Sequence, residues 1–256
     1  MLRLETNEIH IFLIFYYLGE LLMAKRKNLY WTHCAAHCID LILEDIGKIN
    51  KVGNTIKKGV ALSGFIYNHS GILNMMRRLN GNKELVRFGV TRFATSFLCL
   101  QSLHKAKSYL RTMFTSEVWN RSKWAKEIKG KKACDTVLNT HFWNGVTYTL
   151  KVMGPLVRVL RLVDGEKKPA MRYIYEAMDR AKEPIEKSFK NEASYIDIFA
   201  IIDKRWDCQL HYPLHAAGHF LNPQFFYKDP SIEYDIEVTG GLYKCIERLL
   251  SIDKQT

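Results

Sequence analysis

Apolar side chains recur every three or four residues along most of the chain, which is the spacing of one face of an α-helix. The clearest example is the segment 33–52, where charged residues such as Glu44 and Lys48 lie off the apolar stripe. The stripe consists of Ile39, Ile42, Leu43, Ile46 and Ile49. This pattern predicts a helix with one buried face.

Further segments show the same spacing, and strand patterns are rare. The helical segments are 51–67, 72–79, 92–114, 133–163, a stretch opened by Lys168-Pro169, 194–210, 213–221 and 232–250. Glycine and proline predict a loop at Asn68–Gly71, a break at Gly130, a kink or division at Gly154-Pro155, and a bend at Pro184. The only strand candidates are 9–17 and 30–32, so helices dominate the expected fold.

The longest apolar run, Ile11–Leu18, is too short to span a bilayer, which needs about 20 residues. Glu5 and Glu8 occupy the place where a secretory signal would carry positive charge. We therefore expect a soluble, intracellular chain with no membrane partner. The segment 222–231, which holds Pro223 and Pro230, is the best candidate for a boundary between domains.

Charge changes the picture more than composition does. The chain has 38 Lys and Arg against 26 Asp and Glu, a net charge of +12, and the sequence pI is about 9.4. The window Lys48–Lys132 alone holds 18 basic and three acidic residues, whereas Asp164–Thr256 holds 13 and 16. Such asymmetry indicates a polyanion-binding face in the first half and a neutral packing partner in the second.

The densest basic cluster is interleaved with Trp119 and Trp124. Its cations are Arg121, Lys123, Lys126, Lys129, Lys131 and Lys132. Cations neutralise phosphates, and exposed aromatic faces stack on unpaired bases. The alternative is a solvated basic helix with both tryptophans in the core, and both interpretations stay open at this point.

Two histidine patterns could suggest a metal site. His33-Cys34-Ala35-Ala36-His37-Cys38 places two pairs of potential ligands four residues apart, but no second pair follows at zinc-finger spacing. The alternative is a buried thiol and a hydrogen-bonded histidine at a helix start. His211, His215 and His219 lack an intervening glutamate, and we interpret them as a helix surface. No metal and no cofactor is expected, since phosphate-binding and dinucleotide-binding glycine motifs are also absent.

Several blocks in the right order make the chain similar to hAT-superfamily transposase-derived proteins, which are common in plants. The first block is Leu29–Leu41, where Cys34 and His37 match the Cys-x-x-His element of that family. The other blocks are Leu43–Lys48, Phe65–His69, Gly89–Thr95, Lys168–Met171, Tyr173–Met178, Arg205–Asp207 and His215–Pro223. The resemblance runs from about Gly19 to Leu250.

The resemblance implies an RNase H-like catalytic core interrupted by a large helical insertion. For this chain it implies a mainly α fold, a helical insertion domain with the remnant of an RNase H-like α/β core at the N-terminal end. The implied domains are 1–50 for the partial core remnant, 51–225 for the insertion, and 226–256 for a C-terminal helix leading back toward the core. Because Met1–Leu18 does not match, the resemblance also indicates a truncated chain.

The family's chemistry uses three carboxylates that hold divalent metal for strand cleavage and transfer. The first lies upstream of this chain's start, and no Asp or Glu occurs between Glu8 and Glu20, where the second is expected. Cys245–Arg248 resembles the block of the third only superficially, because it precedes the expected place. We therefore expect a catalytically inactive protein with no catalytic residues.

The resemblance and the charge together predict DNA binding in the nucleus. Arg92-Phe93 occupies the place of an Arg-aromatic element near the DNA ends, although Phe93 could equally be a core residue. The expected DNA-binding residues are Lys57, Lys58, Arg77, Arg78, Arg92, Phe93, Lys123, Lys126, Lys129, Lys131 and Lys132. Binding should be non-specific and salt-sensitive. The alternative is a protein–protein interaction module that pairs with a related transposase-like protein.

Overall fold

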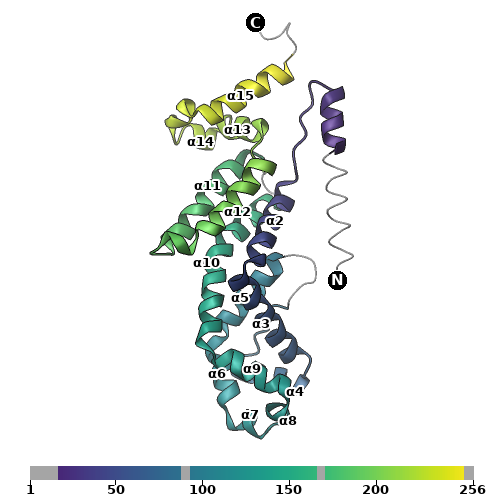
Figure 1. The fold of residues 1–256 in the computed structure, drawn as a ribbon, viewed down its shortest axis with the longest axis vertical. Coiled ribbons are helices and arrows are strands. Elements are labelled where there is room, and N and C mark those ends of the chain that lie inside the picture. The colour runs from purple at the N-terminus through teal and green to yellow at the C-terminus, as the bar shows by residue number, and fades with distance from the viewer. Residues whose placement is uncertain (1–16, 88–92, 166–170, 251–256) are drawn as a thin grey trace. The chain divides into compact units, whose positions relative to one another are not determined.

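The computed structural model describes residues 17–87, 93–165 and 171–250. Every regular element within these ranges is a helix (Figure 1), which confirms the mainly α fold. The first described residues, 17–25, are helical, and the strand expected at 30–32 is irregular chain instead. The strand expected at 9–17 lies outside the described residues except for Tyr17. The remnant of an RNase H-like core is therefore not supported by the described part of the chain.

The chain divides into two compact units by packing. We call Asp40–Arg158 with Pro184–Ile198 the central unit, and Met1–Ile39 with Val159–Glu183 and Phe199–Thr256 the terminal unit. The division falls within helices α2, α10, α11 and α12. The domains that the resemblance implies, 1–50, 51–225 and 226–256, stay a prediction.

The central unit is built from short helices around α3 (Asn50–Tyr67). Helix α3 packs against α4, α5 and α9, and α6 packs against α4, α7 and α9. The bounds are α4 Ser70–Leu79, α5 Phe93–Lys105, α6 Lys107–Thr115, α7 Glu117–Arg121, α8 Lys123–Lys126, α9 Ile128–Leu138 and η1 Glu192–Ser194. Parts of α2 (Ala35–Lys48), α10 (Thr140–Val163), α11 (Met171–Lys187) and α12 (Ile196–Gln209) complete the unit.

The core of the central unit is apolar and aromatic. Its fully buried side chains include Ile46, Leu62, Ile66, Ile72, Met76, Leu100, Leu103, Phe114 and Trp143. The Trp143 indole N–H donates to the Val137 carbonyl oxygen at 2.6 Å, so even this buried polar group is satisfied. Burial of these residues is the main stabilising contribution to the unit.

The terminal unit centres on a close packing of α13 (Pro213–Phe220) against α15 (Ile236–Leu249). A Cβ built on Gly241 would lie 2.5 Å from the Cβ of Ala216, so only glycine allows the two helices to approach this closely. Helix α14 (Pro223–Phe226) and η2 (Pro230–Tyr234) close the unit. Phe225, Ile232 and Val238 form a buried cluster there, and the segment 222–231 thus lies inside a compact unit.

Glycine and proline mark the helix ends less well than expected. Gly130 lies inside α9 instead of ending a helix. Glycine is needed there because a Cβ at this position would overlap the carbonyl oxygen of Trp124. Helix α10 runs through Pro155 without division and begins after Asn139, where the predicted segment 133–163 breaks. The predicted helix 92–114 breaks at Ala106.

Two further expectations concern the bend at Pro184 and the loop at 68–71. Helix α11 continues through Pro184. The loop expected at 68–71 is confirmed but shorter, because α4 already begins at Ser70. Within the described ranges, no helix has the length and apolar character needed to cross a membrane.

Candidate functional site

The whole net charge of the chain belongs to the central unit. That unit contains 22 Lys and Arg against 10 Asp and Glu, a net charge of +12. The terminal unit contains 16 residues of each sign and is neutral. The charge asymmetry along the sequence is therefore also an asymmetry between compact units.

The predicted lysines lie on three helices of the central unit, and all of them are exposed. Lys57 and Lys58 lie on α3, Lys123 and Lys126 on α8, and Lys129, Lys131 and Lys132 on α9. Among the residues that the structure describes, none of these seven forms an ion pair. Their charges are free to meet an external anion.

The predicted arginines differ from the lysines. The guanidinium of Arg77 pairs with the Glu84 carboxylate at 2.5 Å, so its charge is neutralised locally, whereas Arg78 is exposed. Arg92 lies outside the described residues. Phe93 is the first residue of α5, and its side chain also lies outside the description.

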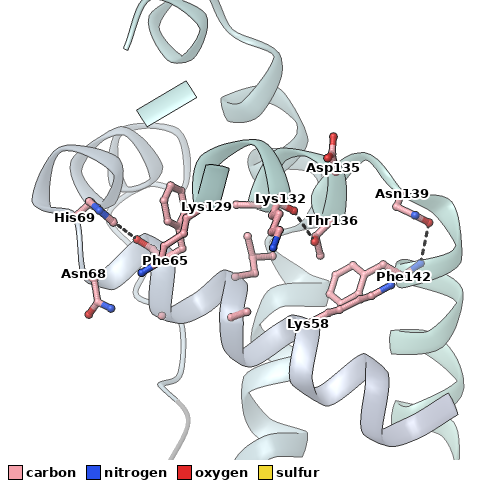
Figure 2. A pocket seen from close by; sticks show the side chains of 14 residues that line it. Lys58, Phe65, Asn68, His69, Lys129, Lys132, Asp135, Thr136, Asn139 and Phe142 are labelled. Atoms are coloured by element: carbon pink, nitrogen blue, oxygen red, sulfur yellow. Dashed lines mark hydrogen bonds between the residues drawn. The ribbon is translucent and has the colours of Figure 1, made fainter. Parts of the chain in front are cut away.

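Three of these lysines meet at a cavity, which we call the α3–α9 groove (Figure 2). Its volume is about 660 Å³. Lys58 comes from α3, and Lys129 and Lys132 come from α9, so two stretches far apart in the sequence supply one rim. The full lining is Lys58, Ala61, Leu62, Gly64, Phe65, Asn68, His69, Lys129, Lys132, Ala133, Asp135, Thr136, Asn139 and Phe142.

The floor of the α3–α9 groove is apolar, and its polar groups are held in place. Leu62, Phe65 and Phe142 are largely buried and line the cavity from below the rim. The His69 Nδ1 lies 2.8 Å from the Phe65 carbonyl oxygen. Asn139 Oδ1 accepts from the amides of the first turn of α10, at 2.7 Å for His141. The arrangement can hold an anion on its rim and an apolar ring on its floor.

Sequence reasoning missed this floor, although a signal was present. Lys58, Leu62 and Phe65 follow one face of α3 at helical spacing, and His69 comes just after the helix ends. On α9, Lys129, Lys132, Thr136 and the following Asn139 repeat the pattern. What the sequence does not reveal is that these two faces meet, since that depends on packing between distant segments.

The two tryptophans of the basic cluster are not exposed platforms. Trp119 is 2% exposed and packs edge-on against Phe65 and Phe114, which confirms the core interpretation for this residue. Trp124 is half-buried, and its ring contacts Gly71. The Lys123 ammonium lies 5.5 Å from the centre of the Trp124 ring, a cation–π contact.

The His33–Cys38 motif packs as a structural element of the terminal unit. Cys38 is buried, and burial raises the pKa of its thiol to about 12. His33 Nδ1 lies 2.9 Å from the Tyr212 hydroxyl, and burial lowers the pKa of this imidazole. Cys34 is exposed and His37 is half-buried. The described residues contain no group of three or more His, Cys, Asp or Glu placed to hold a metal.

The expectation that His211, His215 and His219 form a helix surface is wrong for two of them. His215 and His219 are 3% and 5% exposed, and the ring of His219 packs between Tyr175 and Phe225. His215 Nδ1 lies 2.6 Å from the Leu210 carbonyl oxygen. His211 is exposed, and its Nε2 lies 3.0 Å from a Glu237 carboxylate oxygen.

Comparison with known proteins gives one match. Residues 13–62 match the model of a family described as "Domain of unknown function (DUF659)". The match includes α2, Lys57 and Lys58, and it begins within the segment Met1–Leu18 that the resemblance left out. No curated protein and no solved structure matches the chain. Residues 13–62 are thus similar to a domain family whose function is not defined.

Proposed function

We propose that this chain is a catalytically inactive, hAT transposase-derived protein that binds DNA through charge in the nucleus. One observation carries the proposal: the entire net charge lies in one compact unit. Seven exposed lysines of that unit have no ion pair among the described residues. Phosphates are the commonest partners for such unpaired cations, and releasing their counterions drives binding.

The DUF659 match supports the transposase descent. This domain is found in hAT-like, transposase-derived plant proteins. The finer assignment to the hAT superfamily depends on the sequence blocks from Leu29 to Pro223. Both lines lead to a protein whose ancestors acted on DNA, which agrees with the charge of the central unit.

Binding of this kind is non-specific and steeply dependent on salt. Lysines on helix surfaces meet phosphates, which carry no sequence information. Each neutralised phosphate contributes a slope of about −0.9 in a plot of log affinity against log salt. If six or more phosphates are contacted, affinity falls by about a thousandfold between roughly 50 and 200 mM salt.

The test is a salt-titrated fluorescence anisotropy measurement with the full chain and labelled duplex DNA. Substituting Lys129→Glu, Lys131→Glu and Lys132→Glu together should abolish binding at physiological salt. The matched control is Lys25→Glu, Lys204→Glu and Lys228→Glu, which removes the same charge from exposed positions of the terminal unit. Equal losses in both triple variants, or affinity that is flat with salt, would refute the proposal.

Absence of strand transfer is a separate part of the proposal. It depends on the stretch between Glu8 and Glu20, which has no carboxylate to serve as the second metal ligand of the family's site. Incubating the chain with DNA and Mg²⁺ or Mn²⁺ should give no cleavage. Cleavage that disappears when one Asp or Glu is substituted would show an active enzyme.

A second candidate function, protein–protein interaction, is favoured by an exposed apolar stripe on α15. Ile236 and Tyr243 are 88% and 65% exposed, and with Ile246 they follow one stripe of α15. An exposed apolar stripe at heptad-like spacing favours helix pairing with another protein. The occupant we consider is a related transposase-like protein. Ile236→Asp with Tyr243→Ser should then prevent complex formation with such a relative in analytical ultracentrifugation, whereas the Lys129–Lys131–Lys132 charge reversal should leave it intact.

A further inference from the structure

We propose that the α3–α9 groove binds one unpaired nucleotide of the bound DNA, with the base on its apolar floor and the phosphate at its lysine rim. This inference depends on the proposed DNA binding and assigns a ligand to one place within it. The chemistry that the groove recognises is that of a nucleoside monophosphate. The source we favour is a nucleotide within a strand.

The shape of the groove is the first reason. Its volume of about 660 Å³ lies within the usual range for small-molecule sites, about 300–1,000 Å³. The phosphates of a paired duplex lie on convex ridges, and a flat basic surface is enough to contact them. A cavity adds nothing to that contact, but it can admit a group that leaves the duplex.

The rim carries positive charge from both sides. Lys58 comes from α3, and Lys129 and Lys132 come from α9, the helix that packs against it; all three line the groove (Figure 2). None of the three has an ion pair in the described structure, and Asp135 is the single acidic residue in the lining. An anion bound in the groove would therefore meet an unpaired ammonium group. A phosphate satisfies such a group better than a carboxylate because it offers more acceptor oxygens.

The floor selects for more than a phosphate. Ala61, Leu62, Phe65, Ala133 and Phe142 provide apolar surface below the lysines. A phosphate gains nothing from that surface, whereas a base buries its ring there and contacts aromatic carbon. Asn68 and Thr136 also line the groove and can hydrogen-bond to a base edge. A planar aromatic group joined to a phosphate therefore fits the groove as a whole.

Pairing keeps bases out of the groove. In a duplex each base is stacked and its phosphate faces outward, so the floor and the rim cannot be filled by the same nucleotide. An unpaired nucleotide has no such restriction. Gaps, bulges and frayed ends should consequently bind more tightly than fully paired DNA of the same charge.

Gly64 offers a way to fill the groove without touching a lysine. It lies in α3, lines the cavity, and a Cβ built there meets no atom within 4 Å. Gly64→Leu should therefore occupy the groove without disturbing the helix. Gly240→Leu is the matched control, because Gly240 is also a helical glycine whose Cβ would meet open space, but in the terminal unit.

The experiment compares two labelled duplexes that differ in one group. Each contains a single bulged unit with its phosphate, which is an unpaired deoxyadenosine in one duplex and an abasic sugar in the other. The full-length chain should bind the adenosine bulge at least about fivefold more tightly than the abasic bulge. Gly64→Leu should remove that preference, so that both bulges bind equally, whereas Gly240→Leu should keep the preference.

The outcomes separate this inference from the proposal beneath it. Equal affinity for the two bulges, with steep salt dependence for both, overturns the groove assignment and leaves DNA binding intact. No binding to either duplex at low salt overturns the proposed function and the inference together. Free deoxyadenosine monophosphate should weaken binding of the adenosine bulge until its affinity equals that of the abasic bulge. It should leave binding of the abasic bulge unchanged. If the free nucleotide binds the chain while the bulge preference is absent, the groove serves free nucleotides and the strand source is wrong.

Discussion

His219 on α13 lies between two aromatic rings in the interior of the terminal unit. Its ring stacks on Tyr175 with 5.2 Å between centres and lies 5.0 Å from Phe225. Its Nδ1 is buried and has no hydrogen-bond partner among the described residues. Burial lowers the pKa of this imidazole, although the carboxylates of Glu176 and Asp235 act in the opposite direction. His219 is therefore held in its neutral form.

This environment predicts a loss of stability in mild acid. A pKa below 6.5 in the folded state means that the unfolded chain binds more protons as the pH falls through the range of histidine titration. His215 contributes in the same direction, because burial lowers its pKa too. The free energy of unfolding should thus be highest above about pH 7 and decrease toward pH 5. Urea denaturation at a series of pH values measures this decrease.

A substitution assigns the effect to the buried residue. His219→Phe keeps an aromatic ring between Tyr175 and Phe225 and removes the titrating group, so the decrease toward pH 5 should become shallower. His141→Gln, which changes an exposed histidine on α10, is the control for substituting a histidine as such. A pH profile that is identical for His219→Phe and the unsubstituted chain would contradict the assignment.

Neighbouring glycines in α15 are expected to respond to alanine with opposite signs. A Cβ on Gly240 meets nothing within 4 Å, so Gly240→Ala should stabilise the protein by about 0.5–1 kcal/mol through helix propensity. A Cβ on Gly241 would lie 2.5 Å from the Ala216 Cβ, so Gly241→Ala should force α13 and α15 apart and destabilise by roughly 1–3 kcal/mol. Thermal denaturation of the two variants measures both effects. Equal shifts would mean that α13 and α15 are not in close contact.

At the scale of the element, the helices follow from apolar spacing, but their ends do not. Ile39, Ile42, Leu43 and Ile46 are fully buried, as the stripe in 33–52 predicts. The breaks between α6, α7 and α8 fall at Ser116 and Ser122, whose side chains accept from backbone amides of the following helix. These capping serines are visible in the sequence, and they were better signals than Gly130 or Pro155. Close contact with Trp124 explains Gly130, and no single-sequence pattern reveals such a contact.

The same reasoning limits what could be predicted of the candidate site. The charge pattern and the resemblance together predict the lysines of α3 and α9 as binding residues, and the structure places Lys58 beside the groove with Lys129 and Lys132. The floor was not identified, because Leu62 and Phe142 resemble ordinary core residues in any helical pattern. A concave surface arises only when α3, α9 and the start of α10 pack together.

The cap of α10 provides a test at this scale. Asn139 Oδ1 accepts from the His141 amide at 2.7 Å and from the Phe142 amide at 3.3 Å. Asn139→Ala removes this acceptor and should lower the free energy of unfolding by about 1 kcal/mol, whereas Asn139→Ser should restore most of it. Chemical denaturation of the three proteins provides the comparison. If alanine and serine behave alike, the cap does not stabilise α10.

At the scale of the whole molecule, the division of charge between the two units has an energetic consequence. Like charges on the exposed helices of the central unit repel one another, and the terminal unit, with equal numbers of each sign, lacks this repulsion. Salt screens such repulsion, with a Debye length of about 10 Å at 0.1 M. Salt should therefore weaken DNA binding and at the same time stabilise the unit that binds.

Hydrogen exchange can observe that stabilisation unit by unit. Between about 0.02 and 0.2 M salt, protection of amides in α3 and α9 should increase by an amount on the order of 1 kcal/mol. Amides in α13 and α15 provide the internal control and should change much less. Equal changes in the two units would mean that self-repulsion does not limit the stability of the central unit.

The central unit consists of two stretches of chain, Asp40–Arg158 and Pro184–Ile198, and the ribosome makes the second after the first. The Tyr148 hydroxyl donates to the Ser194 carbonyl oxygen and the Lys151 ammonium to the Ser188 carbonyl oxygen, each at 2.9 Å. Helix α10 therefore forms these hydrogen bonds with residues that are synthesised well after it. A ribosome adds about 5–20 residues per second, and the last stretch, Pro184–Ile198, therefore arrives some seconds after Arg158. During that interval the lysine-rich helices emerge beside ribosomal RNA while their unit is still incomplete. Ribosomal RNA is thus the first polyanion near the lysines of this chain.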